Sequence, residues 1–134
     1  MTAMAENAHT VLAGLRDVRG TVGSFFVSEE GDVLARDLPA VFTDEVLAEA
    51  AQRIVRMTEA FAAGGDEVVF CRVRFGEHLL CLRPTHPGIL CAFATPEAQM
   101  LAMRMGLGLA AQRLAKLDAT PTLVRRVTGE GRTV

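Results

Sequence analysis

The chain has 134 residues, of which 50% are hydrophobic, and its formal net charge at neutral pH is −2. A chain of this length forms one domain and buries a core without disulfides or metals. The hydrophobic share excludes a solvated, disordered chain, and with no basic excess nothing points to nucleic-acid binding.

The first predicted elements are a helix over residues 6–18 and a hairpin of two strands, 21–28 and 33–36. Apolar residues recur at helical spacing in the first segment, which Gly20 follows. The strand at 21–28 is apolar on both faces, which predicts that both of its sides are covered. An acidic turn with a glycine joins the two strands.

A long helix is predicted over residues 43–63, with Thr43 as its N-cap and Gly64 and Gly65 at its end. Its apolar positions cover roughly half of the circumference, wider than the ~100° stripe that one core contact requires. Either the helix lies deep in one core, or a second copy of the chain covers the margin. For a homodimer, the interface residues that we predict are Val46, Ala50, Arg53 and Met57.

Three further strands follow, over residues 67–75, 78–83 and 88–94. A two-residue turn at Gly76 joins the first two, which fixes which residues face each other. A last helix is predicted from Thr95, its cap, to about Leu117, with Pro96 at its first position.

The order of elements is helix, strand, strand, helix, three strands, helix. Strands joined by tight turns are antiparallel. The predicted fold class is α+β, with a five-stranded antiparallel sheet and helices on both faces. We expect a domain over residues 1–117 and a flexible C-terminal tail over 118–134.

No motif of an enzyme or a cofactor site is present. The sequence lacks a phosphate-binding loop of the G-x-x-x-x-G-K-[ST] type, a G-x-G-x-x-G after a strand and an H-E-x-x-H. Ser24 and Ser28 lack a G-x-S-x-G setting. We therefore assign no catalytic residue and no cofactor, and expect a protein that is not an enzyme.

Cys71, Cys81 and Cys91 are an odd number without a C-x-x-C spacing, so no disulfide framework is expected. Zinc is not expected either, because the predicted register places Cys71 and Cys81 on opposite sides of the sheet. We predict a reducing cytoplasm as the compartment, since a secretory signal is not recognisable. No apolar run approaches the ~18 residues that span a membrane.

Three arginines, Arg72, Arg74 and Arg83, fall on one face of the predicted third and fourth strands. Arginine pairs bidentately with carboxylates. These side chains are predicted to bind an acidic partner, or to meet the acids of a neighbouring helix.

Residues 8–117 resemble the roadblock (dynein light chain roadblock) family, in particular its bacterial MglB-type members. The resemblance lies in the first helix ending at Leu15-Arg16-Asp17-Val18-Arg19-Gly20, in the following TVGSFFVSEEGDVLA, and in the order of the remaining elements. It implies a roadblock/profilin-like sheet and a homodimer in which the long helices pack together and the third strands join.

The resemblance also implies a function through binding, in signalling by small Ras-like GTPases in cell polarity or motility. The partner would be a GTPase or another roadblock protein. An adapter and a GTPase-activating protein are both consistent with the sequence. A small-molecule sensor on a profilin-like sheet is a further alternative, and it would require a polar-lined cavity.

Overall fold

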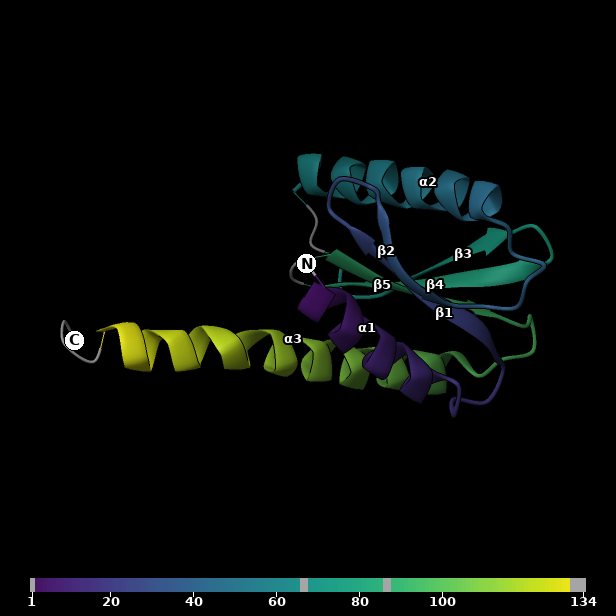
Figure 1. Ribbon diagram of the computed structural model, residues 1–134. Helices are drawn as coiled ribbons and strands as arrows, with labels where there is room; N and C mark the ends of the chain where they lie inside the picture. Colours follow the sequence, from purple (N-terminus) through teal and green to yellow (C-terminus); the bar gives the residue numbers. More distant parts are fainter. Residues whose placement is uncertain (1, 66–67, 86–87, 131–134) are drawn as a thin grey trace.

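Five antiparallel strands form one sheet in the computed structural model, which describes residues 2–65, 68–85 and 88–130 (Figure 1). Within these ranges, side chains are described from Asn7 to Lys116. The strands are β1 (Thr21–Ser28), β2 (Val33–Asp37), β3 (Cys71–Phe75), β4 (His78–Pro84) and β5 (Gly88–Ala94). Their order across the sheet is β2-β1-β5-β4-β3, so β2 and β3 are the edges.

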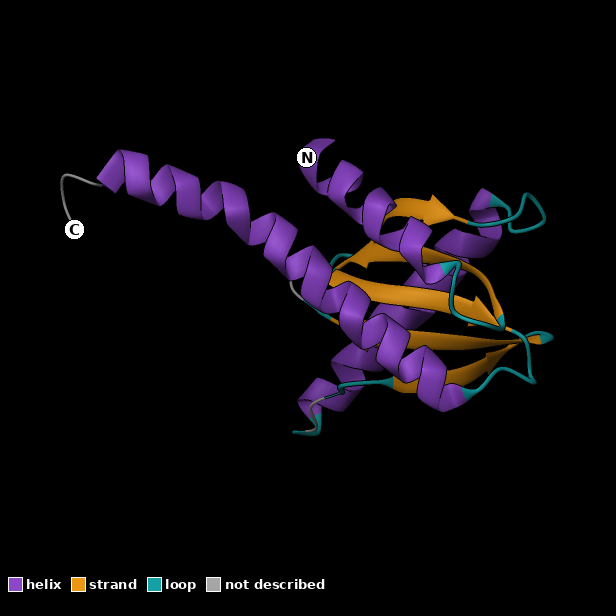
Figure 2. Cartoon of the chain, turned by 90° about the horizontal axis from the view of Figure 1, so that it is seen from below, coloured by secondary structure: helices purple, strands orange, loops and turns teal. Residues whose placement is uncertain are grey.

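Three helices cover the two faces of this sheet: α1 (Thr2–Leu15), α2 (Asp44–Ala63) and α3 (Met100–Glu130). One face carries α2, and the other carries α1 and α3 side by side (Figures 1 and 2). The predicted fold class is confirmed, as are the antiparallel pairing and the order of elements.

Each face of the sheet has its own core. Towards α2, the ring centroid of Phe93 lies 4.6 Å from that of Phe42 and 5.5 Å from that of Phe25. Towards α1 and α3, Phe26 packs with residues such as Leu12. Neighbouring residues of β1 therefore serve opposite cores, which is why this strand is apolar on both faces.

Both predicted ends of α2 are confirmed. The Thr43 hydroxyl accepts a hydrogen bond from the Val46 N–H at 3.2 Å, which satisfies one of the free amides of the first turn. After Ala63, Gly64 caps the helix and Gly65 has a φ of +88°, a conformation that glycine adopts readily.

The last helix begins later than predicted. Thr95 is not its cap; the Thr95 N–H donates to the carbonyl of Gly20 at 3.0 Å, and its own carbonyl accepts from the Ala98 N–H at 3.0 Å. These bonds hold residues 95–98 in a turn that connects the end of β5 to the segment between α1 and β1. A tertiary contact thus overrides a local capping signal, and α3 begins at Met100.

Other boundaries also differ. α1 begins at Thr2 and ends at Leu15, whereas we expected a helix over residues 6–18. α3 continues past Leu117 to Glu130 and extends away from the sheet (Figure 1). β3 begins at Cys71, whereas residue 67, where we expected it to begin, lies outside the described residues. The division into a domain over 1–117 and a flexible tail over 118–134 stays a prediction, because side chains beyond Lys116 and residues 131–134 lie outside the description.

Gly88 allows β5 to approach β1 closely. A Cβ atom at this position would lie 2.2 Å from the carbonyl oxygen of Val27, a backbone atom that cannot move without disturbing the pairing of the two strands. We expect Gly88→Ala to lower the free energy of unfolding by about 1–3 kcal/mol, measured by urea denaturation.

Gly108→Ala is the matched control. In α3 the added Cβ would meet one described atom, the Arg83 Nη1 at 4.0 Å, and alanine is favoured over glycine inside a helix by about 1 kcal/mol. This variant should be at least as stable as the wild type. A similar loss in both variants would show that close packing at Gly88 is not the cause.

Candidate functional site

A groove of about 300 Å³ lies between α2 and the edge strand β3. It is lined by Arg53, Ile54, Arg56, Met57, Val73, Phe75 and Leu80. Ile54 and Leu80 are buried, Met57, Val73 and Phe75 are half-buried, and the two arginines are exposed. An apolar floor with a charged rim is the composition of a protein–protein contact surface.

The side chain of Arg53 links the two walls of this groove. Its guanidinium carbon lies 5.1 Å from the centroid of the Phe75 ring, within the range of a cation–π contact. This contact places a positive charge over the apolar floor, at the open edge of the sheet.

The structure brings three of the four predicted interface residues to this side of α2. Arg53 and Met57 line the groove. Val46 is half-buried and packs against the core between α2 and the sheet. Ala50, the fourth predicted interface residue, is fully buried in the single chain, in the core beneath α2.

The three predicted partner-binding arginines share one face of the sheet, as expected. Arg72 pairs with Cys81 in the register of β3 and β4, and that face lies towards α3. Arg72 and Arg74 are exposed, whereas Arg83 is half-buried and donates to the carbonyl of Val69 at 3.5 Å. The two ion pairs among the described side chains, Arg16–Asp37 and Arg36–Asp44, involve none of them.

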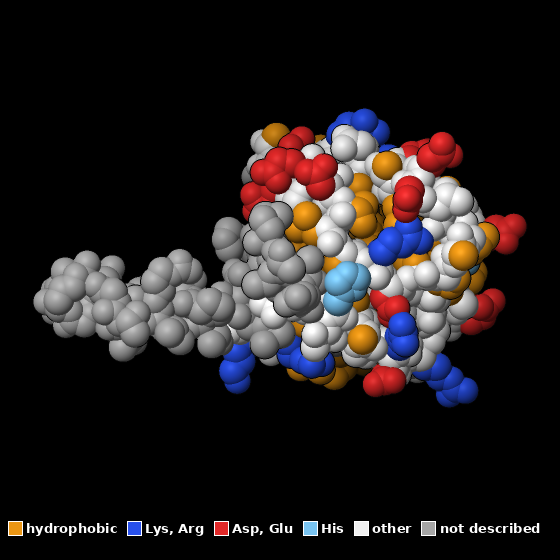
Figure 3. All heavy atoms as spheres, viewed as in Figure 1, with side chains coloured by type: hydrophobic (Ala, Val, Ile, Leu, Met, Phe, Trp, Pro, Cys, Tyr) orange, Lys and Arg blue, Asp and Glu red, His pale blue; other side chains and the backbone are white. Residues whose placement is uncertain are grey.

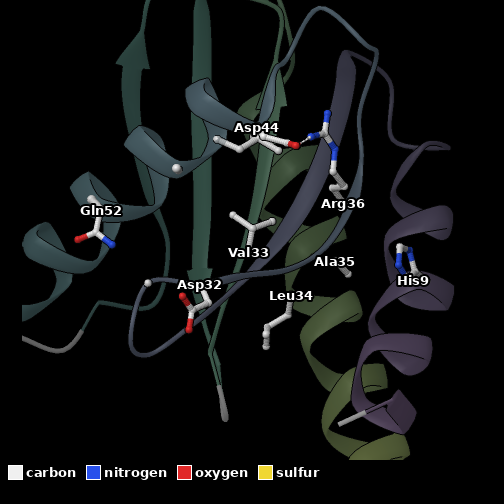
Figure 4. A pocket seen from close by; sticks show the side chains of 11 residues that line it. His9, Asp32, Val33, Leu34, Ala35, Arg36, Asp44 and Gln52 are labelled. Carbon is white, nitrogen blue, oxygen red and sulfur yellow. Dashed lines mark hydrogen bonds and ion pairs between the residues drawn. The ribbon is translucent and has the colours of Figure 1, made fainter.

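A second hollow, of about 500 Å³, lies at the opposite edge, beside β2. Acidic and basic side chains surround apolar ones on this face (Figure 3). His9 approaches from α1 and Gln52 from α2, and Arg36 donates to Asp44 at 2.8 Å (Figure 4). Sequence reasoning missed this hollow because its residues come from three elements that no motif connects.

The two serines have structural roles. The buried Ser24 hydroxyl donates to the carbonyl of Leu12 at 3.4 Å, and the Ser28 hydroxyl accepts from the Asp32 N–H at 3.0 Å in the hairpin turn. These bonds satisfy groups that would otherwise be buried without partners.

The cysteines lie on both sides of the sheet. Cys71 faces Leu82 in the register and Cys81 faces Arg72, as predicted; Cys71 and Cys91 pack towards α2, and Cys81 towards α1 and α3. Burial raises the pKa of the Cys81 thiol to about 11 and that of Cys91 well above its usual value. Among the described residues, no group of three or more His, Cys, Asp and Glu side chains is arranged to hold a metal ion.

Within the same described ranges, no helix is long and apolar enough to cross a membrane. No protein-family model matches the chain, and no curated protein matches its sequence.

Solved structures do match its fold. MglB of Myxococcus xanthus superimposes with a TM-score of 0.73 at 13% identity, over 87% of this chain and 90% of that one. The Roadblock/LC7 domain of Streptomyces avermitilis gives a TM-score of 0.63 at 19% identity, over 87% and 97%. The gliding protein MglB of Thermus thermophilus gives 0.67 at 15% identity, over 85% and 90%.

These matches cover nearly the whole of each compared structure, and they share one arrangement of sheet and helices. The chain has the roadblock fold, which confirms at the level of the fold the resemblance seen in its sequence.

The burial of the cysteines leads to a labelling prediction. At pH 8, a thiol with a pKa of about 11 is ionised in only about one molecule in a thousand, and iodoacetamide attacks the thiolate. In the folded protein, iodoacetamide should therefore leave Cys81 and Cys91 unmodified, whereas in urea it should modify all three cysteines. Rapid native labelling of Cys81, read by peptide mass spectrometry, would contradict this.

The same burial makes stability depend on pH. The folded pKa of Cys81 lies above the ordinary value of 9.0, so the unfolded chain loses this proton first. The contribution of Cys81 is fully present below pH 9 and is lost as the pH rises towards about 11. Cys81→Ala should show a smaller loss of stability than the wild type between these pH values, measured by urea denaturation.

Proposed function

We propose that this protein is a non-enzymatic, homodimeric regulator or adapter in signalling by a small Ras-like GTPase, in cell polarity or motility. The observation that carries the proposal is the groove between α2 and β3 on a roadblock fold. The compartment that we propose is the cytoplasm, where its three free cysteines stay reduced.

The proposed dimer joins the two copies at this groove. β3 has a strand neighbour on one side, β4, so the other side of its backbone is open to pairing. A two-fold contact lets the same surface cover itself, with the β3 edges side by side and the α2 helices in contact. Met57 and Val46, half-buried in the single chain, would become buried in the dimer.

Partner recognition is proposed for Arg72 and Arg74 on β3, with Arg83 beneath them. The first two are exposed, and none of the three is ion-paired with a carboxylate in the described part of the chain. Bidentate pairing with acidic groups of a GTPase, or of another roadblock protein, would use these charges. The chain itself has no phosphate-binding loop, so the nucleotide would belong to the partner.

The sensor alternative is less well supported. A ligand inside a profilin-like domain would need space between the sheet and its helix. That space holds the stacked rings of Phe25, Phe42 and Phe93, and the polar hollow beside β2 lies at the surface instead.

One charged substitution in α2 tests the proposed dimer. Met57→Asp places a carboxylate in the proposed contact, so we expect a monomer that stays folded, measured by light scattering and circular dichroism. Leu109→Asp, on the opposite side of the sheet, is the matched control and should stay dimeric. A monomeric wild type would contradict the dimer, and a dimeric Met57→Asp would move the interface elsewhere.

The rate of GTP hydrolysis by the partner GTPase distinguishes an adapter from a GTPase-activating protein. An adapter binds a Ras-like GTPase of the same organism and leaves its single-turnover rate of GTP hydrolysis unchanged. An acceleration of about tenfold or more would instead make the protein a GTPase-activating protein.

The variant with Arg72→Glu and Arg74→Glu should bind this GTPase, or another roadblock protein of the organism, more weakly while its melting temperature stays close to that of the wild type. If this variant binds the GTPase or roadblock protein as tightly as the wild type does, Arg72 and Arg74 are not part of the partner-binding surface.

A further inference from the structure

Helix α3 has two apolar faces on opposite sides. One faces the sheet, with Met103, Leu107, Ala110, Ala111 and Leu114 in the core. The other faces outward and consists of Leu101, Met105 and Leu109, whose exposed fractions are 68%, 59% and 60%. We call these three residues the outer ridge. They recur every fourth residue, so they form one row along the helix.

Among the described residues, no other element covers the outer ridge, whose side chains are largely exposed. α3 crosses the sheet on its outer side, with α1 beside it rather than over it (Figure 2). The far end of α3 extends away from the sheet and does not fold back (Figure 1). Soluble proteins seldom expose a row of large apolar side chains unless a partner covers it.

The flanks of the outer ridge are positively charged. The guanidinium carbon of Arg104 lies 5.9 Å from the ring of Phe70, towards the β3 side of the helix. Arg113 lies on the other flank, with its Nη1 atom 3.1 Å from where a Cβ atom of Gly14 would be, towards α1. Residues 98–117 contain no Asp or Glu, so no acid of this part of the helix lies among the outer ridge and its two flanking arginines.

We propose that the outer ridge is a docking site for an acidic amphipathic helix of a partner protein. A row of side chains about 6 Å apart is a ridge of the kind that packs into the groove of a second helix. Gly108, next to Leu109, has no side chain, and a Cβ there would meet only the end of Arg83 at 4.0 Å among the described atoms. The partner backbone can therefore approach closely, while its flanking carboxylates pair with Arg104 and Arg113.

Charge argues against a second copy of this chain as the occupant. A two-fold contact between outer ridges would bring Arg104 and Arg113 of both copies together, and residues 98–117 of neither copy would supply an acid. A lipid surface is also disfavoured. The ridge offers three aliphatic side chains and no aromatic one, and the whole chain has a net charge of −2.

The proposed site is independent of the dimer and of the GTPase. It lies on the face of the sheet opposite to α2, so a substitution can disrupt the outer ridge or the groove beside α2 without affecting the other. Met57→Asp should leave binding at the outer ridge unchanged, which separates a failure of this proposal from a failure of the proposed function.

The test uses two designed peptides of about 20 residues, both helical with a leucine stripe, one flanked by Glu and its twin by Lys. We expect the protein to bind the Glu peptide at least about tenfold more tightly than the Lys twin, measured by fluorescence anisotropy. Met105→Asp should abolish this binding. Val41→Asp, which alters another apolar side chain that is 75% exposed, should not.

Charge reversal gives the sharper result. In a variant with Arg104→Glu and Arg113→Glu, the Lys twin should become the tighter ligand, an outcome that a merely destabilised protein would not give. Four results would overturn the proposal: no binding of the Glu peptide, equal binding of both peptides, self-association that Met105→Asp abolishes, or binding to phosphatidylserine vesicles that Met105→Asp abolishes.

Discussion

Burial of the central strands on both faces is the constraint from which the rest of the architecture follows. All residues of β5 are buried, and β1 is buried from Gly23 to Ser28. Such strands are stable only if apolar layers cover both sides of the sheet. One long helix, α2, supplies the first layer and the pair α1 and α3 supplies the second. The close approach at Gly88 lies at the end of the paired strands β1 and β5, where Gly88 faces Ser28.

Much of this architecture could be predicted because the signals are local. The turn at Gly76 sets the register of β3 and β4, including the pairs Cys71–Leu82 and Phe75–His78. Thr43 caps α2 because its hydroxyl reaches an amide three residues away. In each case, residues close in sequence determine the structure.

The errors arise where distant residues decide. Thr95 has the chemistry of a cap, yet a hydrogen bond to Gly20 holds it in a turn. The groove beside β3 and the hollow beside β2 each combine side chains from separate elements, which periodicity within one element cannot show.

The two edges of the sheet differ in a way that limits how the protein can assemble. The pairing of β2 with β1 has an irregular register between Phe26 and Val27, and the last two residues of β2, Arg36 and Asp37, form ion pairs. Proteins use such irregular, charged edges to prevent strands of other molecules from adding on. In the proposed dimer, in which two β3 strands pair, the joined sheet would end at β2 on both sides. In that dimer, the charged, irregular β2 edges would oppose further extension of the sheet, and we expect contacts beyond the dimer to use helix faces.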